Sequence, residues 1–138
     1  MSVDLTGPVS LNLGGVKDAL VPVGWHTVTI ERADAKESSK EKPQIFVLSR
    51  ISDEADPDFN RTVIWNLTDT GDLEDFPMKL FRRCIEALGM PLDLNYPSYQ
   101  ALADDLIGRT FDCKVSHRTY KGEPQTNILQ WRPTQYDF

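Results

Sequence analysis

Apolar residues alternate with polar ones, or run together, in five short segments of the chain. In the first segment, Val28 and Ile30 share one face while Thr27 and Thr29 share the other, which is the period of a half-buried strand. The five predicted strands cover residues 25–33, 44–52, 62–67, 110–118 and 126–132. The polar stretch of residues 33–43, rich in serine and lysine, is expected to be a flexible connection between the first two strands.

Between the third and fourth predicted strands, the period of the apolar residues changes to that of a helix. The residues on its apolar face are Phe76, Leu80, Phe81, Cys84, Ile85 and Leu88. Thr70 or Asp72 is a candidate N-cap for this helix, and Pro77 suits its first turn. A second, shorter helix over residues 98–107 is predicted to begin with Ser98 as its cap.

Three strands, a helical connection and two further strands are the element order of the five-stranded OB-fold barrel. The sequence therefore predicts a mainly β fold of this type, with one or two helices between strands three and four. The first of these helices is expected to close one end of the barrel. Residues 1–24 are expected to form an irregular N-terminal arm, residues 25–133 the OB-fold domain, and residues 134–138 a short tail.

The chain has 138 residues, with 15 lysine and arginine against 21 aspartate and glutamate side chains, and a formal net charge of −6. A negative total argues against nucleic acid, because affinity for phosphate comes from lysine and arginine. The charge is unevenly distributed: residues 51–75 carry eight acidic side chains and one arginine, a net −7, which leaves +1 for the rest. Because binding depends on the local field, the basic stretches at 34–50 and 109–132 keep nucleic-acid binding open.

Signatures of catalysis are scarce in the sequence. His26 and His117 lie at no metal-binding spacing, and the chain has no zinc, phosphate-loop or nucleophile-elbow motif. Cys84 and Cys113 lie among apolar residues and are interpreted as inert core thiols. The acidic residues 53–61 resemble a calcium loop, but they lack the EF-hand glycine and the terminal glutamate. We therefore expect no enzymatic activity, no cofactor and no bound metal.

The sequence also bears on location. No apolar run reaches the length of a membrane span, and the first five residues show no basic and apolar signal segment. Two cysteines fit a reduced compartment better than a disulfide scaffold. We expect neither export nor membrane insertion.

Aromatic and cationic residues are interleaved along the predicted strands, as single-strand binding requires, because cations contact phosphates and rings stack on bases. The candidate DNA-binding residues are Lys36, Lys40, Lys42, Phe46, Arg50, Trp65, Lys114, Arg118, Tyr120, Lys121 and Arg132. Phe46 and Trp65 have an alternative place in the core, whereas Tyr120 at a hairpin tip is harder to place there. Trp25 and Trp131 are interpreted as structural, and a solvated spacer is the alternative for the lysine-rich loop.

Four segments of the sequence resemble those of the phage single-stranded-DNA-binding proteins. They are VPVGWHTVTIERADAKESSKEKPQIFVLSRI, NRTVIWNLT, FRRCIEALGMP and LADDLIGRTFDCKVSHRTYKGEPQTNILQW, within residues 21–132. This resemblance implies an OB-type fold and sequence-independent binding of single-stranded DNA in phage DNA replication or recombination, in the host cytoplasm. Residues 135–138 are similar to the acidic, phenylalanine-terminated tip by which bacterial single-strand binders recruit replication partners, although they hold one acid and follow no long linker.

Two other functions stay open from the sequence. The first is a protein–protein interaction module of a phage replication complex, which would use the same barrel. The second is a metal-dependent nuclease that holds Mg²⁺ with the cluster of Asp53, Asp56 and Asp58. Single-stranded DNA is the expected partner, and replication or recombination proteins and further copies of the chain are additional candidates.

Overall fold

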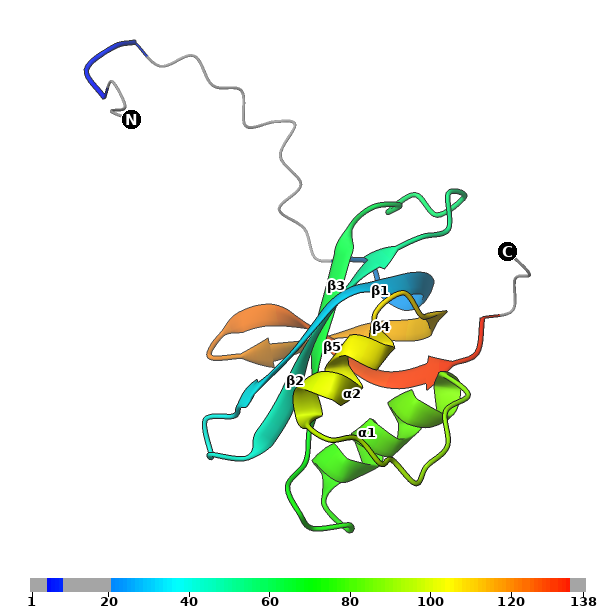
Figure 1. The fold of residues 1–138 in the computed structure, drawn as a ribbon. Helices are drawn as coiled ribbons and strands as arrows, with labels where there is room; N and C mark the ends of the chain where they lie inside the picture. Colours follow the sequence, from blue (N-terminus) through cyan, green and yellow to red (C-terminus); the bar gives the residue numbers. More distant parts are fainter. Residues whose placement is uncertain (1–4, 9–20, 135–138) are drawn as a thin grey trace.

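The computed structural model describes residues 5–8 and 21–134 of the chain (Figure 1). Its elements are β1 (Gly24–Glu37), β2 (Pro43–Ile51), β3 (Thr62–Thr68), α1 (Phe76–Ala87), α2 (Tyr99–Leu106), β4 (Thr110–Tyr120) and β5 (Glu123–Arg132). The predicted order of three strands, a helical connection and two strands is thus confirmed. Most of the predicted N-terminal arm, residues 1–24, and the tail beyond residue 134 lie outside the described residues.

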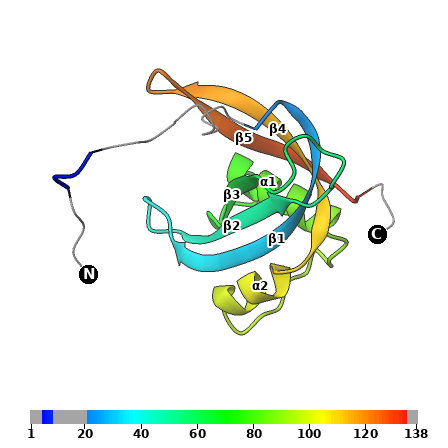
Figure 2. The ribbon, with the colours of Figure 1, turned by 90° about the horizontal axis from the view of Figure 1, so that it is seen from above.

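The five strands form one antiparallel sheet in the order β3-β2-β1-β4-β5, so β3 and β5 are its two edges. The sheet curls strongly (Figure 2), and side chains of its two edge strands meet. The ring centroids of Trp65 on β3 and Trp131 on β5 lie 6.0 Å apart. No backbone pairing joins β3 to β5 among the described residues, so the sheet is curved but open. The prediction of a mainly β fold is confirmed.

The core lies between the sheet and the two helices. Alternate residues of each strand point into it, such as Val63, Trp65 and Leu67 on β3. Helix α1 packs against β3 and β5 and adds Phe81 and Ile85 to the core, while α2 packs against β1 and β2. Because α1 contacts both edge strands, it covers the region where the two edges of the sheet approach.

β1 is longer than the sequence pattern predicts. The predicted connection over residues 33–43 is wrong for residues 33–37, which belong to β1, and residues 38–42 alone join β1 to β2. The side chain of Gln100 on α2 bonds to the backbone of this extension: its Oε1 accepts the amide of Ala35 at 3.0 Å, and its Nε2 donates to the carbonyl of Ala33 at 3.5 Å. A residue distant in the sequence thus supports the extended strand.

The starts of the two helices differ in how they are capped. The prediction that Thr70 or Asp72 caps α1 is wrong, because Asp75 is the N-cap residue and its side chain makes no capping hydrogen bond. The carboxylate of Asp72 instead accepts a backbone amide two residues further on, which belongs to the preceding turn. The predictions of Pro77 in the first turn of α1 and of Ser98 as the cap of α2 are confirmed. Ser98 Oγ accepts a hydrogen bond from the backbone amide of Ala101 at 3.1 Å.

Candidate nucleic-acid interface

The last two strands extend beyond the rest of the sheet as a two-stranded ribbon. The pairing of β1 with β4 ends at Gly24 and Val115, whereas β4 and β5 stay paired as far as Tyr120 and Glu123. Between these points, and among the described residues, the two strands of the ribbon pair only with each other. The ribbon therefore projects from the body of the protein (Figures 1 and 2), and residues 117–125 around its turn are exposed.

The tip of the ribbon carries an exposed aromatic ring and a cation. Lys121 and Gly122 form the predicted turn, with φ angles of +51° and +80°, as in the tight turns that join two strands of a hairpin. The Tyr120 side chain is exposed, and Lys121 Nζ lies 5.4 Å from its ring centroid. The tip can therefore offer a stacking surface next to a positive charge.

One face of β4 carries two further predicted cations. Phe111, Cys113 and Val115 point into the core, so strand alternation places Lys114 and Arg118 on the opposite, outward face. Arg118 is exposed and Lys114 is half-buried. We call the set of predicted residues on these two strands and their turn the β4–β5 row: Lys114, Arg118, Tyr120, Lys121 and Arg132.

Arg132 stands at the other end of the β4–β5 row and is held by two neighbours. Its Nε donates to Asp112 Oδ2 at 3.0 Å, and its guanidinium carbon lies 4.1 Å from the ring centroid of Trp25. Asp112 is buried and also accepts the hydroxyl of Thr27 at 2.7 Å. Asp112 alternates with Phe111 and Cys113 and so lies on the polar face of β4, but this alternation does not explain its burial.

The other predicted residues that stay at the surface lie on β1, β2 and their connection. We call this set the β1–β2 cluster: Lys36, Lys40, Lys42, Phe46 and Arg50. Phe46 is half-buried, and Lys36 Nζ lies 5.3 Å from its ring centroid. Arg50 is already paired, because its Nε lies 2.9 Å from both carboxylate oxygens of Glu31 and its Nη1 donates to the carbonyl of Asn60 at 2.6 Å.

The tips of the two hairpins project from the same side of the molecule in both ribbon views (Figures 1 and 2). One tip carries Lys40 and Lys42, and the other carries Tyr120 and Lys121, all of them exposed. Residues that are about eighty positions apart in the sequence are thereby brought to one side of the fold. The fold thus places two hairpin tips with exposed lysines on one side of the molecule.

The prediction that Trp65 stacks on bases is wrong. Its side chain is 7% exposed and packs edge-on against Phe111 and Trp131, with ring centroids 5.7 and 6.0 Å away. The physical reason is the period of β3, because Val63 and Leu67 share the inward face with Trp65. The structural role predicted for Trp131 is confirmed by the same packing.

An apolar pair on the outward face was missed from the sequence. Leu48 on β2 pairs with Ile64 on β3, and Ile64 is 51% exposed. Phe46 lies on the same face of β2, two residues away. The signal was available, because an inward Trp65 requires an outward Ile64.

The acidic turn between β2 and β3 is occupied by internal bonds. His26 Nδ1 lies 2.6 Å from Asp56 Oδ2, and Arg61 Nη1 donates to Asp58 Oδ1 at 3.0 Å. Within residues 5–8 and 21–134, no three His, Cys, Asp or Glu side chains gather closely enough to hold a metal ion. In the same residues, no helix is long and apolar enough to cross a membrane.

Comparison with known proteins does not indicate what this surface binds. No protein-family model matches the chain, and no curated protein matches it. What the β4–β5 row can bind is therefore inferred from its own residues.

Proposed function

We propose that this chain binds single-stranded DNA without sequence specificity, along the β4–β5 row, with the tip of the β1–β2 hairpin as a second contact. The observation that carries the proposal is the outward face of the ribbon, where Lys114, Arg118 and Lys121 accompany the exposed ring of Tyr120. Lys114 and Tyr120 are six residues apart on one strand, which corresponds to about 20 Å. No catalytic group is needed for such binding, and we propose none.

Arg132 supports the proposal because it is positioned before any ligand arrives. Its bond to Asp112 and its stacking on Trp25 fix the plane of the guanidinium. A fixed cation loses less side-chain entropy on binding than a free one. Because Arg132 is ion-paired with Asp112, the three other cations of the β4–β5 row set the salt dependence, which is about −2 for log K against log salt if each meets one phosphate.

The strand order supports a closer description of the fold. We infer a five-stranded OB-type barrel, since the sheet order β3-β2-β1-β4-β5 and the helix between β3 and β4 are those expected of it. The packing of Trp65 on Trp131 brings the two edges together in the way that closure requires. In that fold, the loops that join β1 to β2 and β4 to β5 are the ones that hold oligonucleotides.

The test is fluorescence anisotropy of labelled oligo-dT over a salt series, with the full chain. Arg118→Ala is expected to lower the salt slope by about 0.7, because one phosphate contact is removed. Tyr120→Ala is expected to weaken binding by about 1–3 kcal/mol at an unchanged slope, because stacking is insensitive to salt. The matched control is Arg82→Ala, which removes an exposed cation of α1 and should leave binding unchanged.

Two results would overturn the proposal. One is the absence of oligo-dT binding at low salt, or binding that is indifferent to salt. The other is equal loss in Arg118→Ala and Arg82→Ala, which would mean that the whole surface, rather than the ribbon, attracts the DNA.

A further inference from the structure

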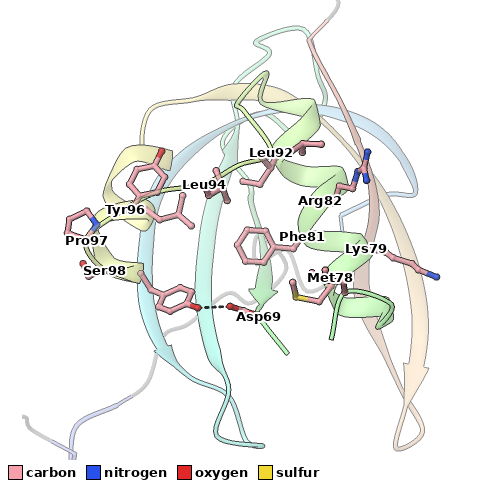
Figure 3. A pocket seen from close by; sticks show the side chains of 14 residues that line it. Asp69, Met78, Lys79, Phe81, Arg82, Leu92, Leu94, Tyr96, Pro97 and Ser98 are labelled. Atoms are coloured by element: carbon pink, nitrogen blue, oxygen red, sulfur yellow. Dashed lines mark hydrogen bonds between the residues drawn. The ribbon is translucent and has the colours of Figure 1, made fainter. Parts of the chain in front are cut away.

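A large pocket lies on the helical side of the protein, away from the β4–β5 row. It has a volume of about 940 Å³, opens to solvent, and is lined by α1, the first turn of α2, the segment between them, and Asp69 and Leu73 before α1 (Figure 3). Most of its lining is apolar and includes Met78, Phe81, Ile85, Leu92, Leu94 and Leu102. Phe81, Leu92 and Leu94 point into the space between the helices. A pocket of this size and lining is suited to receive an apolar group.

Exposed apolar side chains gather at the rim of this pocket. Leu73, in the loop before α1, is 83% exposed, and Leu92 and Tyr99 are also exposed large side chains. Single exposed leucines are common, but three large exposed side chains that line one pocket are the kind of apolar surface that interaction sites use.

The charges around the pocket are complementary to each other. Leu73 is preceded by Asp72 and followed by Glu74 and Asp75, so an exposed apolar anchor is surrounded by acidic groups. The wall formed by α1 carries the exposed cation Lys79. Neither Lys79 Nζ nor the Glu74 carboxylate bonds to another side chain within the described part of the chain. The pocket is also lined by Asp69 and by Arg82, which is ion-paired with Glu86, so Lys79 is the cation of its wall that can meet an acidic group beside an apolar anchor.

We propose that the occupant of this pocket is Leu73 of a second copy of the chain, with Glu74 of each copy meeting Lys79 of the other. Leu73 stands at the rim of its own pocket, so two copies related by a twofold axis at that rim can exchange anchors reciprocally. Anchor, pocket and paired charges then form one self-complementary surface, with a buried centre and a polar rim. This interface goes beyond DNA binding, because none of its residues belongs to the β4–β5 row.

The first test is sedimentation equilibrium of the full chain, without DNA, over a range of protein concentrations. The parent is expected to show a monomer–dimer equilibrium. Leu73→Ser should raise the dimer dissociation constant at least about tenfold, which corresponds to about 1.4 kcal/mol. The matched control is Ile64→Ser, which removes a half-exposed aliphatic side chain from the outward face of β3 and should leave the dimer unchanged.

The second test exchanges the charges. Lys79→Glu and Glu74→Lys should each weaken self-association, because each places like charges opposite one another. Mixed in equal amounts, the two variants should form a heterodimer, because both contacts then join opposite charges. This recovery requires both variants to be folded, so misfolding cannot imitate it.

Three results would overturn the proposal. They are a parent that stays monomeric at every concentration, a dimer that Leu73→Ser leaves intact, and a mixture of the two charge variants that does not recover. All of these measurements are made without DNA, so their outcome is independent of whether the ribbon binds oligo-dT.

Discussion

Replacing Asp112 with alanine should destabilise the fold far more than removing an ion pair from the surface. The Asp112 side chain is 2% exposed, although it lies on the outward face of β4. It accepts the hydroxyl of Thr27 at 2.7 Å and Nε of Arg132 at 3.0 Å. Alanine would leave both donors without their acceptor and would leave a small cavity between them.

The magnitude follows from the exposure of the two donors. The Thr27 hydroxyl is buried, so leaving it without an acceptor costs about 1–3 kcal/mol. The Arg132 side chain is 35% exposed, so its guanidinium can form a hydrogen bond with water instead. Losing the Asp112 acceptor therefore costs less at Arg132, about 1 kcal/mol after allowance for solvent screening. We expect Asp112→Ala to lower the free energy of unfolding by about 3 kcal/mol and the Tm by about 10 °C.

The control is Glu86→Ala, which removes the exposed partner of Arg82 on α1 and should cost at most about 0.5 kcal/mol. The assay is urea unfolding followed by tryptophan fluorescence, because Trp65 and Trp131 lie in the core. A difference of less than about 1 kcal/mol between the two variants would refute the reasoning, because it would mean that water already satisfies the Asp112 site.

Three further outcomes follow from the structure. Burial raises the pKa of both Cys84 and Cys113, that of Cys113 to about 12, so both thiols stay protonated near neutral pH. A thiol reagent should therefore modify neither in the native protein and both after unfolding, and rapid native labelling would contradict their burial. The hydrogen bond from Tyr96 lowers the pKa of Asp105 in the folded state. This bond therefore stabilises the fold at pH values above the pKa that Asp105 has in the unfolded chain. The stabilisation is lost as the pH falls through the lower pKa of the folded state. The difference in unfolding free energy between the parent and Asp105→Asn should accordingly shrink below about pH 4, and a constant difference would show that the bond has no net effect. Lys121→Asn should stabilise the hairpin by about 0.5 kcal/mol, because asparagine tolerates the positive φ of this position. The same substitution should lower the salt slope of oligo-dT binding by about 0.7. An unchanged slope would exclude Lys121 as a phosphate contact.

The order of strands and helices is predictable from the sequence because each element carries its own period. In β3, the residues that decide the position of Trp65 are not its immediate neighbours. The immediate neighbours of Trp65 are Ile64 and Asn66, which suggest a mixed environment, but the residues that share its face are Val63 and Leu67. Comparing residues two apart would have placed Trp65 in the core and Ile64 at the surface.

Other features depend on contacts that no local pattern contains. Asp112 is buried by bonds to Thr27 and Arg132, which lie 85 and 20 residues away in the chain. The extension of β1 is bonded by Gln100 on α2, across another long separation. The pocket likewise exists only once α1, α2 and the segment between them are placed, so it has no signal in the pattern of the sequence.

The ribbon formed by β4 and β5 has a consequence for its motion. Its register shifts between Lys114 and Val115, at the same place where β1 stops pairing with β4. Beyond this point, each of the two strands has a single partner strand within residues 21–134, so the ribbon can open locally while the sheet stays intact. Amide hydrogens should therefore exchange faster near Arg118 than near Phe111. A ligand held by the ribbon must first immobilise this arm, so part of the free energy of binding is spent on ordering it.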